Sequence, residues 1–299
     1  MSATAVPLLA PGQVLIDVPT LRACLHAGQA LRLIDARCAP AIGGGDRAAG
    51  RKAWQAGHLP GALHADLDQD LAAPAASAPG QGRHPLPEQA AFNAALGRWG
   101  IDTDTTVVVY DAADGSMAAA RLWWLLRLLG HQRVVVLDGG VAAWSAAGLA
   151  LDTDLPVVAG LPPYPGRFDR QQMVDADQVL ARLGQGPGWL LDARAPARFA
   201  GHSEPVDPVA GHVPGAINRP FALNLRDGRF RPAAELRAEL EPLLHGRPPS
   251  QAVLMCGSGV TACHLLLAME HAGLAGAKVY AGSWSGWISD RTRPLATGP

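Results

Sequence analysis

Cysteines are few in this sequence, and their scarcity excludes a fold built on disulfides. The 299 residues contain four of them, Cys24, Cys38, Cys256 and Cys263, and no Cys-x-x-Cys pair. Four cysteines in a chain of this length are too sparse for a disulfide scaffold. A reducing compartment suits such a chain best, so we expect a cytoplasmic protein in which Cys256 stays free.

Long apolar runs and dense basic runs are also missing. Every apolar run is shorter than the roughly 18 residues of a membrane span, so we expect no membrane segment. The first seven residues, Met-Ser-Ala-Thr-Ala-Val-Pro, lack the basic start and apolar core of a secretion signal. With a net charge of −1 and scattered Lys and Arg, nothing indicates a nucleic-acid or membrane partner.

The sequence does contain enough apolar residues for the hydrophobic cores of two domains. Hydrophobic residues make up 48% of the chain and charged residues 17%, so it can bury sizeable cores. The length suits two domains of ordinary size.

An internal repeat determines the expected architecture, because four sequence blocks recur in the same order. The blocks pair Leu-Ile-Asp-Ala-Arg at 33–37 with Leu-Leu-Asp-Ala-Arg at 190–194, Gly-His-Leu-Pro-Gly-Ala at 57–62 with Gly-His-Val-Pro-Gly-Ala at 211–216, Val-Val-Val-Tyr-Asp at 107–111 with Val-Leu-Met-Cys at 253–256, and Asp-Gly-Gly-Val-Ala-Ala-Trp at 138–144 with Ala-Gly-Ser-Trp-Ser-Gly-Trp at 281–287. Chance similarity would not keep four blocks in sequence, so the chain contains two copies of one unit.

Short β-rich runs alternate with helical patterns in each copy. In the first copy, the patterns predict elements that are listed here in chain order: a helix over 18–26, a strand over 31–35, a helix over 88–99, a strand over 106–110, a helix over 116–129 and a strand over 133–137. Such alternation is typical of an α/β fold, a parallel sheet flanked by helices on both faces. In these sheets, ligands bind at the carboxyl ends of the strands.

The chain divides at a stretch rich in proline. Residues 152–166 hold four prolines and two glycines, which predicts a linker between a first domain over 1–151 and a second domain over 167–299. The Ala-, Pro- and Gly-rich stretch 72–87 reads as a surface loop, and the tail beyond Trp287 as poorly ordered.

The stretch 252–262 has the pattern of a reactive corner. A buried strand over 253–255 leads through Cys256 and two flanking glycines, 257 and 259, into a helical pattern that runs to 271. Backbone N–H groups at such a helix start favour a thiolate, which is a nucleophile, and can hold a transferred sulfur. A plain buried cysteine is the alternative. The glycines, with the hydroxyls of Ser258 and Thr261, favour catalysis.

The corresponding corner of the first copy has Asp111 where the second has Cys256. An aspartate cannot do thiolate chemistry, so we expect a catalytically silent first domain with a supporting or substrate-shaping role. Asp111 itself is best explained as a loop cap at a strand end. The site should then lie where the two copies face each other.

These motifs resemble the tandem rhodanese-type sulfurtransferases over almost the whole chain. The loop Cys-Gly-Ser-Gly-Val-Thr-Ala at 256–262 resembles the 3-mercaptopyruvate sulfurtransferase version. The thiosulfate version typically carries Arg and Lys directly after the cysteine, where this chain has Gly257 and Ser258, which leave the site less cationic. The resemblance implies two rhodanese-like domains. It also implies a reaction that needs neither a metal nor an organic cofactor.

The resemblance also implies a two-step sulfur transfer. Cys256 takes sulfur from 3-mercaptopyruvate or thiosulfate as a persulfide and passes it to a thiol, a thioredoxin-like protein or cyanide. Loop N–H groups would stabilise the sulfur, and those expected to do so belong to Gly257, Gly259, Val260, Thr261 and Ala262.

Further site residues follow from the same resemblance. Arg198 matches the arginine that binds the anionic end of the donor. Mercaptopyruvate enzymes often carry a second arginine shortly afterwards, but the segment 204–212 has none. A Ser–His–Asp relay proposed in that subfamily would use Ser258 and His58, with Asp46 as a candidate acid. Because His58 recurs as His212, a structural role at the Pro-Gly turn is the alternative.

Other functions remain open at this stage. They include a rhodanese proper, transferring sulfur from thiosulfate to cyanide, and a non-enzymatic sulfur-carrier or interaction module. A cysteine phosphatase fits poorly, because it needs an arginine six residues after the cysteine, where this chain has Ala262. Papain-like hydrolysis is weak because no histidine is obviously placed to pair with the thiolate.

Overall fold

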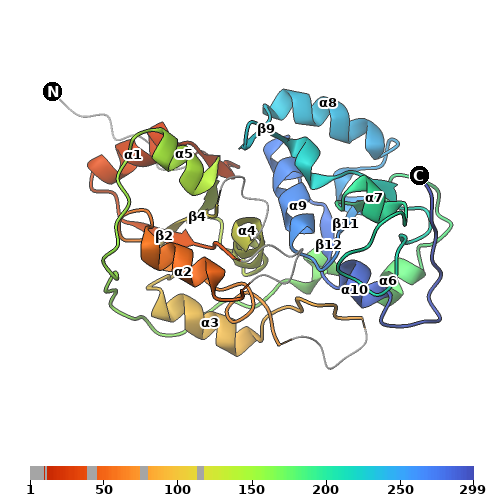
Figure 1. The fold of residues 1–299 in the computed structure, drawn as a ribbon, viewed down its shortest axis with the longest axis horizontal. Helices are drawn as coiled ribbons and strands as arrows, with labels where there is room; N and C mark the ends of the chain where they lie inside the picture. The colour runs from red at the N-terminus through yellow and green to blue at the C-terminus, as the bar shows by residue number, and fades with distance from the viewer. Residues whose placement is uncertain (1–9, 11, 39–45, 75–79, 113–117) are drawn as a thin grey trace.

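The two halves of the chain each build one five-stranded parallel sheet (Figure 1). The computed structural model describes residue 10 and residues 12–38, 46–74, 80–112 and 118–299. The strands of the first sheet are β1 (Leu15–Ile16), β2 (Leu31–Asp35), β3 (Leu63–His64), β4 (Thr106–Tyr110) and β5 (Val134–Leu137). Those of the second sheet are β6 (Met173–Val174), β7 (Leu190–Asp192), β8 (Ile217–Asn218), β11 (Val253–Met255) and β12 (Lys278–Tyr280).

The strand orders of the two sheets are equivalent. They run β1-β5-β4-β2-β3 and β6-β12-β11-β7-β8, with every neighbouring pair parallel. The central strands are β4 and β11, whose residues are all buried. Continuous apolar runs of this kind are typical of strands covered on both faces. The predicted α/β fold with two parallel sheets is thus confirmed.

Helices flank both sheets and repeat in the same order. Those of the first half are α1 (Val18–His26), α2 (Ala49–Ala56), α3 (Gln89–Arg98), α4 (Ala118–Leu128) and α5 (Gly140–Ala146). Those of the second half are α6 (Ala176–Leu180), α7 (Pro196–Phe199), α8 (Ala233–Leu243), α9 (Thr261–His271) and α10 (Ser283–Trp287). The second half adds three short 3₁₀ helices, η1 (Arg170–Gln172), η2 (Phe221–Asn224) and η3 (Pro249–Gln251), and a hairpin of β9 (Leu225–Arg226) and β10 (Arg229–Phe230). Among the described residues, no helix is long and apolar enough to span a membrane.

The helices that follow the two central strands join the halves. Helix α4 packs against α9, and both lie in the middle of the molecule (Figure 1). In α4 every residue except Arg127 is buried, and all of these buried residues except Arg121 are apolar, as expected of a helix that is enclosed on all sides. One continuous hydrophobic core includes residues of both helices and both sheets. The two corners after β4 and β11 are therefore brought towards one interface.

Of the predicted surface loop 72–87, residues 75–79 lie outside the described residues, and the described segment 80–87 is not a simple surface loop. Gly80 N–H donates to Ser289 Oγ (2.8 Å) and Arg83 N–H to Ser285 Oγ (3.0 Å), so the segment 80–84 lies against α10 of the other half. Pro85 and Pro87 are buried. The prediction was wrong because Pro- and Gly-rich composition shows only that a segment is irregular, not that it faces solvent.

The C-terminal tail is anchored, contrary to the prediction from composition. Trp287 Nε1 donates to Pro294 O (2.9 Å), and His212 pairs with Ala296 in an antiparallel bridge. The first half closes in the same way, since His58 forms an antiparallel bridge with Asp152.

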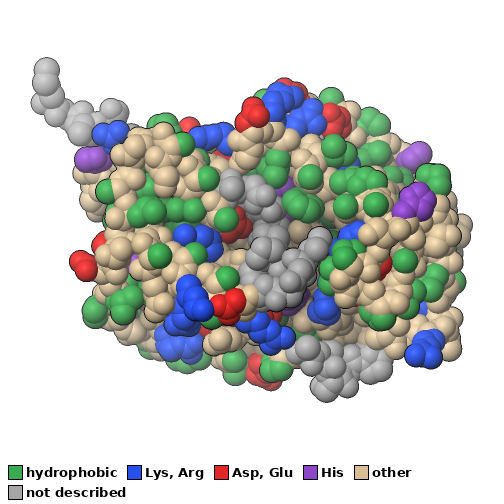
Figure 2. Space-filling view, viewed as in Figure 1, with side chains coloured by type: hydrophobic (Ala, Val, Ile, Leu, Met, Phe, Trp, Pro, Cys, Tyr) green, Lys and Arg blue, Asp and Glu red, His purple; other side chains and the backbone are tan. Residues whose placement is uncertain are grey.

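On the face shown in Figure 2, basic side chains occur in separate groups with acidic ones among them.

Candidate active site

The corner after β11 holds the Cys256 sulfur against backbone N–H. Cys256 is 2% exposed, and Gly259 N–H donates to its Sγ over 3.2 Å. Gly259 has φ +80°, and a methyl group there would lie 2.3 Å from Ala281 O, so the turn requires glycine. Val260, Thr261 and Ala262 follow as the cap and first residues of α9, whose amides form the positive end of the helix. Among the described residues, the amide of Gly259 is the one bonded to the sulfur.

Ser283, which sequence reasoning missed, supports Cys256 from α10. Cys256 N–H donates to Ser283 Oγ (3.0 Å), and this oxygen lies 3.9 Å from Sγ. The hydroxyl proton has a nearer acceptor in Tyr280 O at 2.9 Å. Ser283 is fully buried with φ +51°, a conformation that L-residues rarely adopt. Such local strain is typical of functional sites.

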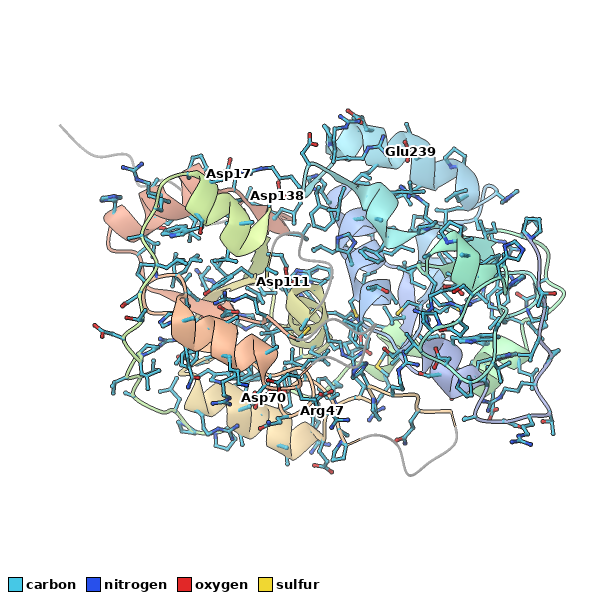
Figure 3. The ribbon with its side chains drawn as sticks, in the orientation of Figure 1. Asp17, Arg47, Asp70, Asp111, Asp138 and Glu239 are labelled. Carbon is cyan, nitrogen blue, oxygen red and sulfur yellow. The ribbon has the colours of Figure 1, made fainter. Side chains whose placement is uncertain are left out.

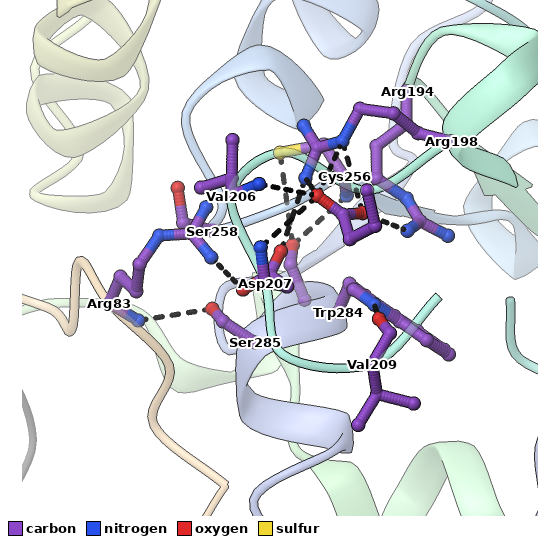
Figure 4. A network of polar contacts seen from close by, with 12 residues as sticks. Arg83, Arg194, Arg198, Val206, Asp207, Val209, Cys256, Ser258, Trp284 and Ser285 are labelled. Carbon is purple, nitrogen blue, oxygen red and sulfur yellow. Dashed lines mark hydrogen bonds and ion pairs between the residues drawn. The ribbon is translucent and has the colours of Figure 1, made fainter. Parts of the chain in front are cut away.

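Two guanidinium groups lie over Gly257, directly after the cysteine. A methyl group at Gly257 would be 3.2 Å from Nη2 of Arg83 and 3.5 Å from both Nη atoms of Arg198. A side chain at 257 would thus press on both guanidinium groups, whereas only Gly259 of this pair has a positive φ. Asp207 lies between the two arginines, as Figure 4 shows, and forms ion pairs with both.

Arg198, the predicted donor-binding residue, is oriented by acidic partners. Its Nε and Nη2 bind the Glu204 carboxylate over 2.6–3.1 Å, and Nη2 also contacts Asp207 Oδ2 at 3.1 Å. Burial raises the pKa of Glu204, but the bonds from Arg198 and from two backbone N–H groups outweigh it, and the pKa is lowered. Burial raises the pKa of Asp207. These contacts fix Nε and Nη2 of Arg198. The remaining nitrogen, Nη1, lies near Gly257.

The arginines of the repeated Asp-Ala-Arg blocks have a structural role in both halves. Arg194 bonds to Asp192 (2.7 Å) and Gly211 O (2.8 Å). Arg37 makes the equivalent bonds to Asp35 and Gly57 O, each at 2.6 Å.

Ser258 contacts a histidine of the first half, but this histidine is His84. Ser258 Oγ lies 2.8 Å from His84 Nδ1, and His84 Nε2 lies 3.5 Å from Asp68 Oδ1. Burial, followed by the charges of Arg121 and Arg83, lowers the pKa of His84 to about 4. The imidazole is therefore neutral at pH 7, and its contact with Asp68 is not an ion pair there.

The structure does not bring His58 or Asp46 to Ser258. His58 is fully buried, its Nδ1 lies 2.8 Å from Trp54 O, and its ring stacks on Trp54. His212 repeats this arrangement with Phe199 O at 2.9 Å, so both histidines hold their Pro-Gly turns. Asp46 is exposed and pairs with Lys52 at 2.7 Å.

Arg121 of α4 ties the first half to the cysteine loop. Its guanidinium is fully buried, and Nη1 donates to Gly259 O (3.1 Å). Its Nη2 donates to the carbonyls of His84 and Pro85, each at 3.1 Å. Burial lowers its pKa. One cation thereby fixes both the carbonyl of the sulfur-binding glycine and the segment that carries His84.

Asp111 occupies the first half's equivalent corner, beside α4 (Figure 3). Its Oδ2 accepts from Ala119 N over 3.4 Å, and the residue is 2% exposed. The prediction was a loop cap at a strand end, whereas this carboxylate accepts from a backbone N–H in the first turn of α4, where a negative charge is favourable. Across the described parts of both halves, no group of three or more His, Cys, Asp or Glu is arranged to hold a metal.

The chain is similar to known proteins over most of its length. The model of the rhodanese-like domain matches residues 17–147 and again 175–290. The chain is 49% identical over 257 residues to a "probable 3-mercaptopyruvate sulfurtransferase" of Pseudomonas aeruginosa, covering 85% of this chain and 89% of that one. It is 39% identical over 295 residues to a "putative thiosulfate sulfurtransferase" of Mycobacterium tuberculosis, covering 97% and 99%.

Solved structures of proteins with the same names superpose on this chain. The crystal structure of SseA from Escherichia coli, described as a 3-mercaptopyruvate sulfotransferase, superposes with a TM-score of 0.75 at 30% identity, covering 91% of this chain and 99% of that one. The 3-mercaptopyruvate sulfurtransferase from Leishmania major gives 0.78 at 30% identity, covering 92% and 74%. Two matching domains, two equivalent sheets and relatives aligned over most of their length show that the chain belongs to the rhodanese family, with two rhodanese-like domains in tandem.

Proposed function

We propose that this protein is a sulfurtransferase that takes sulfur from 3-mercaptopyruvate as a persulfide on Cys256 and gives it to a thiol acceptor. The observation that carries this proposal is the Cys256 corner, where Gly259 N–H meets Sγ at 3.2 Å beside Arg198 and Ser258. The second domain (167–299) would carry the thiol, and the first (1–151), joined by the linker 152–166, would shape the site. Thioredoxin-like proteins and cyanide are further acceptors.

The first step is a displacement at sulfur. The Cys256 thiolate attacks the thiol sulfur of the donor, an S–S bond forms and the donor C–S bond breaks. The electron pair of that bond leaves on the three-carbon fragment as the enolate of pyruvate, which takes up a proton. Arg198 would bind the donor carboxylate through its planar fork of donors.

Ser258 would supply that proton. Its hydroxyl is hydrogen-bonded to His84, whose neutral ring at pH 7 can take part in proton exchange with it. In the second step the acceptor thiolate attacks the outer sulfur, and the S–S electrons return to Cys256 as thiolate. The amide of Gly259 and the start of α9 would stabilise the sulfur anion in both steps.

Thiosulfate is the second candidate donor, since two guanidinium groups near Gly257 also suit a dianion. Turnover with each donor, for the wild type and for Ser258→Lys, separates the two. We expect the wild type to prefer 3-mercaptopyruvate and the added cation to raise turnover of thiosulfate. A strong preference of the wild type for thiosulfate would reverse the donor assignment.

The persulfide is tested by mass spectrometry. After exposure to 3-mercaptopyruvate, we expect one added sulfur on the peptide that contains Cys256, removed again by a thiol acceptor. Cys256→Ser should neither gain sulfur nor release pyruvate. Full activity of that variant would exclude the mechanism.

A further inference from the structure

We propose that Arg121, which helix α4 of the first domain contributes, is a positioning residue whose buried positive charge stabilises Cys256 as a thiolate. The inference rests on the proposed function, because sulfur transfer requires Cys256 to be a thiolate before the first step and again after the second. It gives the first domain, which has Asp111 in place of the cysteine, a specific part in the reaction.

The guanidinium group of Arg121 is a buried charge without a carboxylate partner. It is fully buried, and none of the ion pairs between described residues involves it. A guanidinium keeps its proton in proteins, and carbonyl acceptors satisfy its N–H groups without cancelling its charge. A buried charge of this kind is unfavourable unless an opposite charge lies nearby. The carbonyl acceptors of Arg121 belong to Leu71 (3.4 Å) and to His84, Pro85 and Gly259 (3.1 Å each).

The two cysteines of the second domain are the source of negative charge near Arg121. Burial lowers the pKa of Arg121, and a negative charge on Cys263 or on Cys256 would raise it. Cys263 is a neutral thiol at pH 7, because burial raises its pKa to about 12. Cys256 is therefore the group whose negative charge Arg121 would stabilise.

Arg121 also acts on the sulfur through Gly259. The carbonyl of Gly259 accepts from Arg121 Nη1 at 3.1 Å and from Cys263 Sγ at 3.2 Å, so both of its lone pairs are used. The amide of the same glycine donates to Cys256 Sγ over 3.2 Å. Because Gly259 has φ +80° and lies directly against Ala281 O, a fixed carbonyl also fixes the direction of this amide. Arg121 thus contributes both a charge and the orientation of the sulfur's hydrogen-bond donor.

The surroundings of Arg121 make its charge effective. Every other buried residue of α4 is apolar, and the guanidinium carbon lies 4.9 Å from the centroid of the Trp124 ring. Helix α4 packs against α9, which begins directly after the cysteine loop (Figure 1). Charges interact more strongly in apolar surroundings than at a surface, and dissolved salt screens them less.

The other charged groups around the cysteine loop are more exposed or already paired. Arg83 and Arg198 have side chains that are 31% and 14% exposed, and both pair with Asp207. Arg198 also pairs with Glu204. Burial lowers the pKa of His84 to about 4, so its titration lies below the range in which thiols ionise. A change in the ionisation of Cys256 can therefore be measured without a change in these groups.

The first test follows thiolate formation by ultraviolet absorbance as a function of pH, after subtraction of the same protein carrying Cys256→Ser. In Arg121→Gln we expect the midpoint of this titration to rise by about one pH unit or more, because the thiolate loses its buried counter-charge. A rise of less than about half a unit overturns the inference. The matched control is Arg127→Gln in the same helix, where the arginine bonds to Gln132 and should not affect the midpoint.

The second test separates a charge from mere structural support. The ratio of kcat/KM for 3-mercaptopyruvate between Arg121→Gln and the wild type should be about a tenth or less at a pH below both midpoints. It should return to within about threefold of unity above both midpoints, because high pH restores the thiolate. A ratio that is equally low at every pH would show that Arg121 only supports the fold.

The third test uses the wild type alone, so it does not depend on the folding of a variant. The midpoint of the absorbance titration should rise by less than about half a pH unit between low salt and about 1 M KCl, because salt hardly screens a buried charge. A larger rise would assign the thiolate to the exposed cations Arg83 and Arg198. If these tests succeed but Cys256 gains no sulfur from 3-mercaptopyruvate, the proposed function fails while the effect of Arg121 on the thiolate stands.

Discussion

The corners after the two central strands have the same backbone plan and different chemistry. In the first domain β4 leads to Asp111, whose carboxylate caps α4; in the second β11 leads to Cys256, whose sulfur receives the Gly259 amide. The first domain has nevertheless not become a mere duplicate. It supplies His84 to Ser258 and Arg121 to the cysteine loop. One copy thus holds Cys256, while the other holds groups that surround its loop.

A second pair of positions differs in the same sense. Gly140 begins α5 with φ +53°, and Ser283 begins α10 with φ +51°. Glycine adopts this conformation without strain, whereas serine does not. In the second domain, the backbone is therefore strained at the residue whose hydroxyl lies beside Cys256. The equivalent glycine of the first domain is not strained.

The largest expected effect comes from moving the thiol to the other corner. In the double variant Cys256→Ser with Asp111→Cys, we expect kcat/KM for 3-mercaptopyruvate to fall by about 10³-fold or more. By the spacing of the Asp-Ala-Arg blocks, the sequence has Ala41, which lies outside the described residues, at the position that corresponds to Arg198, so we expect no matching arginine for the donor in the first domain. Pyruvate release is the measurement. Recovery to more than about a hundredth of wild-type activity would show that the first corner lacks only its thiol.

Exchanging the two strained positions should have an intermediate effect. Ser283→Gly removes the hydroxyl but also the strain, so we expect kcat/KM to fall about tenfold with little loss of stability. Gly140→Ser introduces the strain without the function and should lower the free energy of unfolding by about 1–2 kcal/mol, with activity within about twofold. Urea unfolding and donor kinetics measure both. Equal effects on activity would contradict a role for Ser283 at the sulfur.

The smallest expected effect concerns pH. His84 has a pKa of about 4 in the folded chain, against about 6.5 when unfolded, so the unfolded chain binds more protons between these values. Its contribution to stability is complete above pH 6.5 and is lost as pH falls towards 4. Between pH 7 and pH 5 we expect the wild type to lose about 1–2 kcal/mol more than His84→Gln. Parallel pH profiles of unfolding would show that the buried ring does not titrate as described.

The corner of Cys256 could be predicted from sequence because its signals are local. The buried run 253–255, the glycines and the helical pattern lie within one short stretch, and the repeat predicted two copies of one α/β unit. His84 and Arg83 could not be found in this way. Their segment has no periodicity, and their partners Ser258 and Asp207 are 174 and 124 positions away.

The prediction that His58 is the partner of Ser258 was wrong for a related reason. Its Gly-His block occurs in both copies, and a residue that both copies keep is explained by a need that both share, here the bond to Trp54 O or Phe199 O. The strain of Ser283 is a backbone property that the sequence does not reveal. A signal was present, however, since the repeat aligns Ser283 with Gly140.

The buried guanidinium of Arg121 also limits how a donor can enter. Its acceptors are carbonyl oxygens of both domains, those of Leu71, His84, Pro85 and Gly259. If the two domains moved apart, the guanidinium group of Arg121 would lose hydrogen-bond acceptors while it stayed in apolar surroundings. Such a loss is strongly unfavourable. The contacts of Arg121 therefore favour a donor reaching Cys256 while the two domains stay together.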